Sequence, residues 1–149
     1  MSHATVLQGV HCVLTLEERA PGVVLVTIDG TDVGELADAP FRALDEMVGG
    51  DRRVELFVDA ERARGPSIDV SNDWARWFSS NRDALRHVSM LTSSRFVRIT
   101  ADFVRRFADL GQRMRLYTDP AVFAGALSNA VGNAELDASA AQPVTTPDG

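Results

Sequence analysis

Two serines, a carboxylate and a histidine in the middle of the chain are the candidates for nucleophilic chemistry. The segment VDAERARGPSIDVS, residues 58–71, contains Asp59, Ser67 and Ser71. A serine nucleophile needs a histidine within hydrogen-bond reach as its base, and a carboxylate that orients the histidine. His87 is the nearest histidine, and it lies roughly four helical turns beyond Ser71. A hydrolase-type enzyme is therefore the least favoured function, and we expect no catalytic residues.

The other sequence motifs predict neither a metal nor a cofactor. No cysteine or carboxylate stands at metal-ligand spacing from His3, His11 or His87. The glycine-rich dinucleotide fingerprint, the P-loop and the Gly-x-Ser-x-Gly turn are missing from the sequence. His87 is expected near the C-terminus of a helix, where the helix dipole favours its cationic form.

The composition is that of one globular domain. A chain of 149 residues can bury a core without metals or disulfides. Its net charge of -6 disfavours nucleic acid as a partner, because phosphate backbones attract basic surfaces. No apolar run in the sequence is long enough to cross a membrane. The first residues lack a secretion signal and the single Cys12 fits a reducing compartment, so we expect a cytoplasmic protein without membrane contact.

The pattern of apolar and polar residues predicts alternating strands and helices. Strands joined by helical crossovers imply an α/β protein with a mixed, mostly parallel sheet. Strands are predicted at 11–18, 22–30, 52–60, 87–93 and 113–118, the first two as an antiparallel hairpin. About four helices are predicted, between Asp38 and Gly49, from a cap at Ser71 or Asn72 to about His87, over 94–110, and from Asp119 to 131.

Both ends of the chain are predicted to lie outside the domain. Residues 1–10 precede the first predicted strand and are expected to be flexible. Beyond residue 131 the sequence is rich in Ala, Ser, Thr and Pro, so burial there cannot offset the entropy of ordering. We therefore assign residues 11–131 to the domain and expect residues 132–149 to be disordered.

Two predicted helices carry many aromatic residues. Trp74, Trp77 and Phe78 follow the i, i+3, i+4 spacing of a helix that packs its apolar face on a sheet. The alternative is that one tryptophan stays at the surface, where it anchors a partner or lines an apolar pocket. In the 94–110 helix, a second set of large residues shares one face, namely Phe96, Ile99, Phe103, Phe107 and Leu110.

Four segments together resemble a known family. They are the opening hairpin, VTIDGTDV before the first helix, VELFVDA as the central strand, and the closing RMRLYTDPAVFAGAL. With these, residues 10–131 resemble the STAS domains, the SpoIIAA-like family of anti-sigma-factor antagonists. The resemblance implies a STAS-like mixed sheet, made of a hairpin followed by βαβαβ units, and a regulatory domain that binds a protein and is not an enzyme.

The resemblance also implies a regulatory serine in the loop after the central strand, which a partner kinase phosphorylates. Ser67 is the closest candidate, and Ser71 is the second. Eight residues separate Asp59 from Ser67, Pro66 precedes this serine, and the family's Ser-Ser-Gly pattern is missing. The chain is thus more similar to a stand-alone bacterial branch that lacks the motif and carries aromatic residues in the following helix.

Three hypotheses follow. The leading one is a non-catalytic regulatory domain whose partner is an unidentified protein, such as a kinase-like or sigma-regulatory protein, or a second copy of the chain. Its partner or ligand surface comprises the loop at 60–73 and the helix after it, with Asp59, Arg62, Arg64, Trp74, Trp77 and Phe78. The second is the binding of a small apolar ligand in a pocket of on the order of several hundred Å³ between the aromatic helix, the sheet and the 95–110 helix. The third, an enzyme, requires a cleft where a serine, a histidine and a carboxylate meet.

Overall fold

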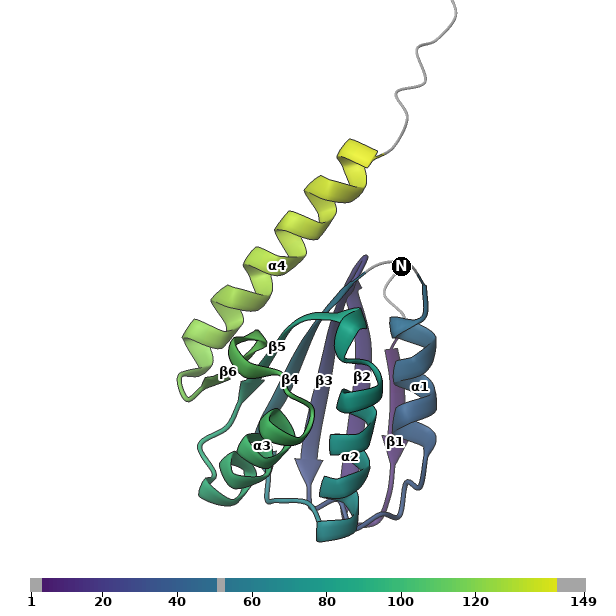
Figure 1. Cartoon of the computed structure of the whole chain (residues 1–149), viewed down its shortest axis with the longest axis vertical. Coiled ribbons are helices and arrows are strands. Elements are labelled where there is room, and N and C mark those ends of the chain that lie inside the picture. The colour runs from purple at the N-terminus through teal and green to yellow at the C-terminus, as the bar shows by residue number, and fades with distance from the viewer. Residues whose placement is uncertain (1–3, 51–52, 142–149) are drawn as a thin grey trace, which may run out of the picture.

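The strands form a single mixed sheet in which every strand lies beside its neighbours in the sequence. The computed structural model describes residues 4–50 and 53–141. Over these residues the strand order is β1-β2-β3-β4-β5-β6, antiparallel from β1 to β3 and parallel from β3 to β6 (Figure 1). The strands are β1 (Ala4–Gln8), β2 (Cys12–Ala20), β3 (Val23–Gly30), β4 (Val54–Ala63), β5 (Leu85–Leu91) and β6 (Met114–Tyr117). The predicted α/β class, with an antiparallel hairpin before the parallel units, is confirmed.

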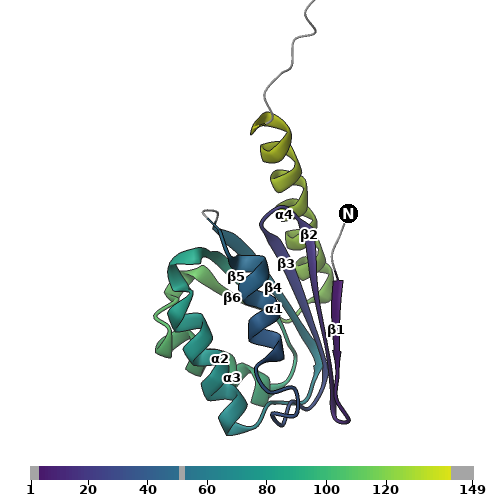
Figure 2. The same cartoon turned by 90° about the vertical axis from the view of Figure 1, so that its right-hand side faces the viewer.

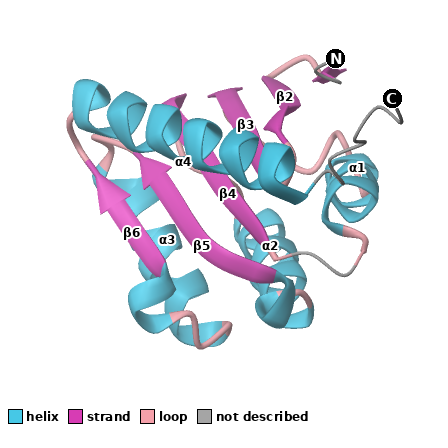
Figure 3. Ribbon diagram, turned by 90° about the horizontal axis from the view of Figure 1, so that it is seen from above, coloured by secondary structure: helices cyan, strands magenta, loops and turns pink. Residues whose placement is uncertain are grey.

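Four α-helices cover the two faces of this sheet. Helices α1 (Ala39–Val48), α2 (Ile68–Ser80) and α3 (Arg95–Phe107) lie on one face, and α4 (Pro120–Ala141) lies on the other (Figures 2 and 3). Crossovers between parallel strands are right-handed, and here each crossover moves one strand further in the same direction. For that reason α1, α2 and α3 must all lie on the same side.

The pleat of β4 divides the interior into two cores. Successive side chains of a strand point to opposite faces of the sheet. Leu56 and Val58 therefore pack beneath α1, α2 and α3, whereas Phe57 packs against Phe123 of α4. Both sides of β4 are buried, as its nearly continuous apolar sequence indicates.

The limits of α2 differ from the predicted ones. The helix begins at Ile68, because the hydroxyl of Ser67 accepts a hydrogen bond from the backbone N–H of Val70 and caps the helix. Ser71, one of the two predicted caps, lies inside the first turn, where its Oγ donates to the carbonyl oxygen of Ser67. The helix ends at Ser80. His87 is consequently part of β5, and the prediction that it lies at a helix end is wrong.

Both ends of the domain extend beyond the predicted boundaries. Ala4–Gln8 forms β1 within the segment expected to be flexible, because its backbone pairs with β2. Helix α4 continues to Ala141, well past residue 131, because small side chains such as Ala130 and Ala134 pack against the second core. Residues 1–3 and 142–149, the rest of these two predictions, lie outside the described part. In the described ranges, no helix is both long and apolar enough to span a bilayer.

Candidate functional site

The aromatic residues of α2 are mainly part of the core. Trp77 and Phe78 expose 7% and 3% of their surface. The indole Nε1 of Trp77 donates a hydrogen bond to Asp45 Oδ1 at 2.9 Å, which ties α2 to α1. Trp74 is half-buried and meets Phe41 edge to face, with ring centroids 4.9 Å apart. The helical spacing therefore marks a packing face, and only Trp74 reaches the surface.

The six predicted surface residues do not lie together. Asp59 follows Val58 in β4, so its side chain points to the face covered by α4, away from Trp74. Its carboxylate accepts the backbone N–H of Glu61. Arg62 and Arg64 are exposed beyond this point, and Arg62 faces Asp29 across 3.8 Å. The predicted surface thus separates into buried aromatic residues, a carboxylate on the other face, and two arginines at the end of β4.

The serines and His87 lie at opposite ends of the parallel strands. His87, at the start of β5, is 3.2 Å from a carboxylate oxygen of Glu55, near the start of β4. Ser67 follows the far end of β4, so the structure does not bring it to His87. His11 pairs separately with Glu35 at 3.4 Å. Among the described residues, no three His, Cys, Asp or Glu side chains are grouped so that they could hold a metal ion.

Cys12 is a buried core residue. It exposes 2% of its surface, and burial is the largest of the effects that raise the pKa of its thiol to about 11. The nearby carboxylates of Asp32, Glu35 and Asp29 add to this shift. The thiol is therefore protonated at neutral pH, and it is a poor nucleophile because the thiolate is the reactive form.

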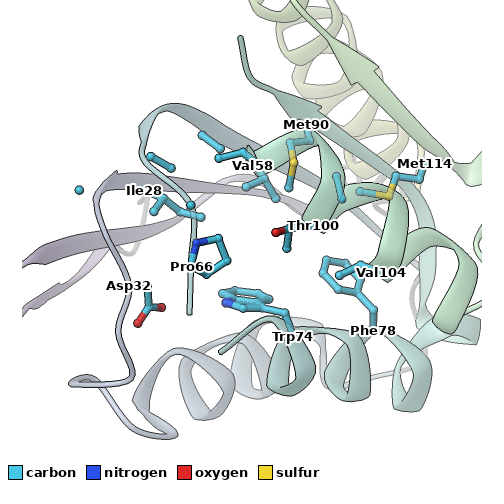
Figure 4. Close-up of a pocket in the computed structure, with 16 residues that line it drawn as sticks. Ile28, Asp32, Val58, Pro66, Trp74, Phe78, Met90, Thr100, Val104 and Met114 are labelled. Carbon is cyan, nitrogen blue, oxygen red and sulfur yellow. The ribbon is translucent and has the colours of Figure 1, made fainter. Parts of the chain in front are cut away.

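A small apolar pocket lies between α2, α3 and the sheet (Figure 4). Its volume is about 60 Å³. Val58 and Met90 line it on the sheet, Trp74 and Phe78 on α2, and Val104 on α3. The position is the one predicted for a ligand pocket, but the volume is far below the roughly 300 Å³ at which small-molecule sites begin. This α2–α3 pocket has room for a small side chain and none for a typical organic ligand.

Asp32 is a buried carboxylate at the edge of the α2–α3 pocket. Its Oδ1 accepts the backbone N–H of Gly34, and its carbonyl oxygen accepts the N–H of Ser67. Burial raises the pKa of Asp32, and the charges of Glu35 and Asp73 act in the same direction. The backbone of Asp32 thus ties the loop after β3 to Ser67, the cap of α2. Burial disfavours the charged form of the Asp32 side chain.

Replacing Asp32 by Asn is expected to stabilise the protein at neutral pH. The folded-state pKa of Asp32 is raised, so the folded state holds this proton more tightly than the unfolded state does. The resulting penalty is absent below the unfolded-state pKa and develops as pH rises through the folded-state pKa. Asn keeps an oxygen for the N–H of Gly34. Urea unfolding of both proteins from pH 3 to pH 7 should show the gain of Asp32→Asn growing with pH, and a gain independent of pH would contradict the assignment.

Filling the α2–α3 pocket is expected to stabilise the fold. Ala60 is fully buried in β4 and lines the pocket, and the substitution Ala60→Val adds two methyl groups with a side chain suited to strands. A cavity of this size should yield about 1 kcal/mol when filled. Denaturant unfolding of Ala60→Val measures the change. A loss of more than about 1 kcal/mol would mean that the pocket is too narrow at this point and that the strand is overpacked.

Four of the ten large apolar residues that are exposed in the described part of the chain lie on α3, on the side turned away from the sheet. Phe96, Ile99, Phe103 and Phe107 expose 72%, 60%, 39% and 52% of their surface, and we call them the apolar stripe. The rings of Phe103 and Phe107 are 5.9 Å apart. The side facing the sheet carries a second, smaller apolar set, Val97, Ala101, Val104 and Ala108.

Sequence reasoning noted this face of α3 but did not assign it to a binding surface. The signal was the presence of two apolar faces on one helix, only one of which can face a sheet. The small set follows the same helical spacing as the aromatic set, and it allows the helix to pack closely. The bulky set is left outside.

Comparisons with known proteins identify the fold. No family model and no curated protein matches the sequence. Among solved structures, one match is an uncharacterized protein of the DUF3478 family from Shewanella loihica PV-4, which is described as having a SpoIIAA-like fold. Its TM-score is 0.57 and its sequence identity is 9%, and the match covers 85% of this chain and 93% of that chain. An anti-sigma factor antagonist from Mycobacterium paratuberculosis matches with a TM-score of 0.48 and 14% identity over 86% of this chain and 95% of that chain. The match with the TM-score of 0.57 shows that the fold is SpoIIAA-like, as the resemblance to STAS domains predicted.

Proposed function

We propose that the protein is a non-catalytic regulatory domain that binds another protein in the cytoplasm. The observation that carries the proposal is the apolar stripe of α3. Monomeric proteins rarely expose a contiguous group of large apolar side chains, and such groups mark contact surfaces. Aromatic residues in particular act as anchors in protein interfaces, because each buries a large area with little loss of conformational freedom.

The binding surface that we propose combines this stripe with the loop before α2 and with Trp74. A side chain added at Gly65 would contact Phe96, which places the loop before α2 directly beside the stripe. Trp74 and Pro66 lie at the edge of the α2–α3 pocket, and both are partly exposed. This surface keeps Trp74 from the predicted set and replaces Asp59, Trp77 and Phe78 with residues of α3.

Phosphorylation of Ser67 would regulate this surface, and Ser71 is the weaker candidate. Ser67 caps α2, so a phosphate there would meet the backbone N–H groups and the positive end of the helix dipole. The added charge would stand beside apolar residues that a partner has to cover. Ser71 is less suitable, because its hydroxyl is engaged in a bond to the carbonyl oxygen of Ser67.

Quantitative affinity enrichment from the native host tests the proposal. Wild type, Phe103→Glu and the matched control Val122→Glu serve as baits, since Val122 is also exposed but lies on α4, on the opposite face of the sheet. We expect a protein that is retained by wild type and Val122→Glu, is lost with Phe103→Glu, and forms a complex with the purified chain in light scattering. Equal enrichment by all three baits, or no complex, would contradict the proposal. Mass spectrometry of the bait reads phosphate at Ser67 and Ser71.

A further inference from the structure

We infer that the partner presents an acidic amphipathic helix, which packs along α3 and inserts a small aliphatic side chain into the α2–α3 pocket. This inference rests on the proposed function and adds the chemistry of the partner. Docking of an amphipathic helix against an apolar groove is a common mode of recognition, with anchors at helical spacing. The apolar stripe covers three turns of α3 at this spacing, from Phe96 to Phe107.

The charges along α3 indicate the sign of the charge that the partner should carry. Arg95, Arg98 and Arg106 are exposed, and none of them forms an ion pair with any residue in the described part of the chain. The two carboxylates of the same region are already paired, Asp102 with Arg105 and Asp109 with Arg82. The stripe is thus bordered by unpaired positive charge, although the chain as a whole carries a net charge of -6. Opposite charges across an interface set its specificity and orientation.

The pocket supplies a place for an anchor beside the stripe. Thr100 is shared between the two features, because it lines the pocket and lies one helical turn from both Phe96 and Phe103. Gly65 and Pro66, on the other side, are partly exposed and line the same pocket. The pocket is apolar and too small for a separate ligand, so an aliphatic side chain carried by a docked helix fits it best.

A second copy of the chain is a poorer occupant of this surface. Packed parallel about a twofold axis, two α3 helices would offer each other no unpaired carboxylate, because Asp102 and Asp109 are already paired. Packed antiparallel, they would bring the same edge of the stripe against itself. Arg95 and Arg106 lie on one edge, near opposite ends of the helix. Each Arg95 would therefore stand opposite the Arg106 of the other copy, and these like charges repel.

A membrane surface is also a poorer occupant. Aromatic residues with arginines are typical of helices that lie on anionic lipid. However, an anionic bilayer, unlike one docked helix, meets a whole face of the domain, and the net charge of the chain is negative. A flat lipid surface also supplies no side chain to fill the α2–α3 pocket.

Synthetic peptides test the inference with the full chain. The probe is an 18-residue helical peptide with leucine at heptad positions a and d and glutamate on both flanks, and its two controls carry glutamine or lysine on the flanks. Binding is followed by anisotropy of the labelled peptide. We expect the glutamate peptide to bind about tenfold more tightly than the glutamine peptide, and the lysine peptide more weakly still, as two to three exposed ion pairs would give. Added salt should reduce the difference.

Variants of the protein then localise the contact. The double substitution Arg95→Gln, Arg106→Gln should remove most of the preference for glutamate, and Arg19→Gln on β2 should not. Ala60→Val, which fills the pocket from the side of the sheet, should weaken binding of the leucine peptides. The preference for glutamate over glutamine and lysine flanks should remain. Circular dichroism confirms that each variant is folded.

Several results would overturn the inference. They are equal binding of the three peptides, binding to vesicles with 30% phosphatidylserine in preference to the glutamate peptide, and a concentration-dependent dimer that Phe103→Glu disrupts. If binding of a native partner depended on Phe103 but did not depend on acidic residues of the partner, the acidic helix would be refuted. The proposed function would not be affected by that result. Loss of that partner's dependence on Phe103 would refute the proposed function itself.

Discussion

The substitution Trp77→Ala is expected to lower the free energy of unfolding by about 3 to 5 kcal/mol, the usual range for removing a buried tryptophan. Trp77 is almost fully buried, packs its ring against Phe78 with centroids 5.3 Å apart, and donates to Asp45. Loss of the ring opens a cavity between α1 and α2 and leaves Asp45 without its indole partner. A protein of this size has a total stability of about 5 to 15 kcal/mol, so the variant would be close to unfolding.

Guanidinium unfolding followed by circular dichroism measures this loss, with Asp45→Asn as the first control. The asparagine side chain keeps an oxygen as acceptor for the indole N–H, and the change should amount to less than about 1 kcal/mol. Trp77→Phe should lie between the two, because it restores most of the apolar volume. If Trp77→Ala left stability within about 0.5 kcal/mol of wild type, the residue would be a surface residue after all. Any binding defect of Trp77→Ala must accordingly be read as loss of fold.

Phe123→Ala is expected to lower the free energy of unfolding by about 3 to 4 kcal/mol, because it removes the ring that holds α4 to the sheet. Phe123 meets Phe57 and Tyr117 edge to face, with ring centroids 5.8 Å apart in both pairs. It is the largest residue that α4 contributes to the second core, and the other buried residues of the helix there, Leu127 and Ala130, are smaller. Without it, α4 should detach and expose Phe57.

Hydrogen exchange distinguishes detachment of α4 from general loosening. The amides of α4 should exchange much faster in Phe123→Ala, while those of β3 and β4 stay protected until global unfolding. The adjacent Val122 is exposed, so Val122→Ala should change the free energy of unfolding by less than about 0.5 kcal/mol and serves as the control. Equal losses in the two variants would show that α4 is not anchored through Phe123.

Local patterns were sufficient to predict five of the six strands and the four helices, but not the edge strand β1. Alternation in β2 and the β-branched run in β3 indicated the hairpin, and helices between the later strands indicated parallel pairing. Pro120 after Asp119 marked the start of α4. These features depend on residues within a few positions of one another, and the resemblance to STAS domains depended on the same segments. The cap of α2 at Ser67 was missed because Ser71 and Asn72 are equally good caps by residue type.

The binding surface was harder to predict because it depends on which way side chains face. Asp59 was grouped with Trp74 by sequence proximity, but a strand residue changes face at every step, and Val58 takes the face beneath α2. In α3, the aromatic residues were the more hydrophobic set, yet the close approach of the helix to the sheet admits only small residues such as Ala101 at the contact. Phe103 faces outward because the distance between α3 and the sheet is short. The periodicity of one helix gives no information about that distance.

The sequential order of the strands has a consequence for how the chain folds. Because each strand pairs only with its neighbours in the sequence, no strand pairing requires a segment that is distant in the sequence. The mean sequence separation between contacting residues is kept low for a protein with a largely parallel sheet. Folding rates rise as this separation falls. Assembly can therefore advance along the sheet from the β2–β3 hairpin to β6, with α4 closing the second face last.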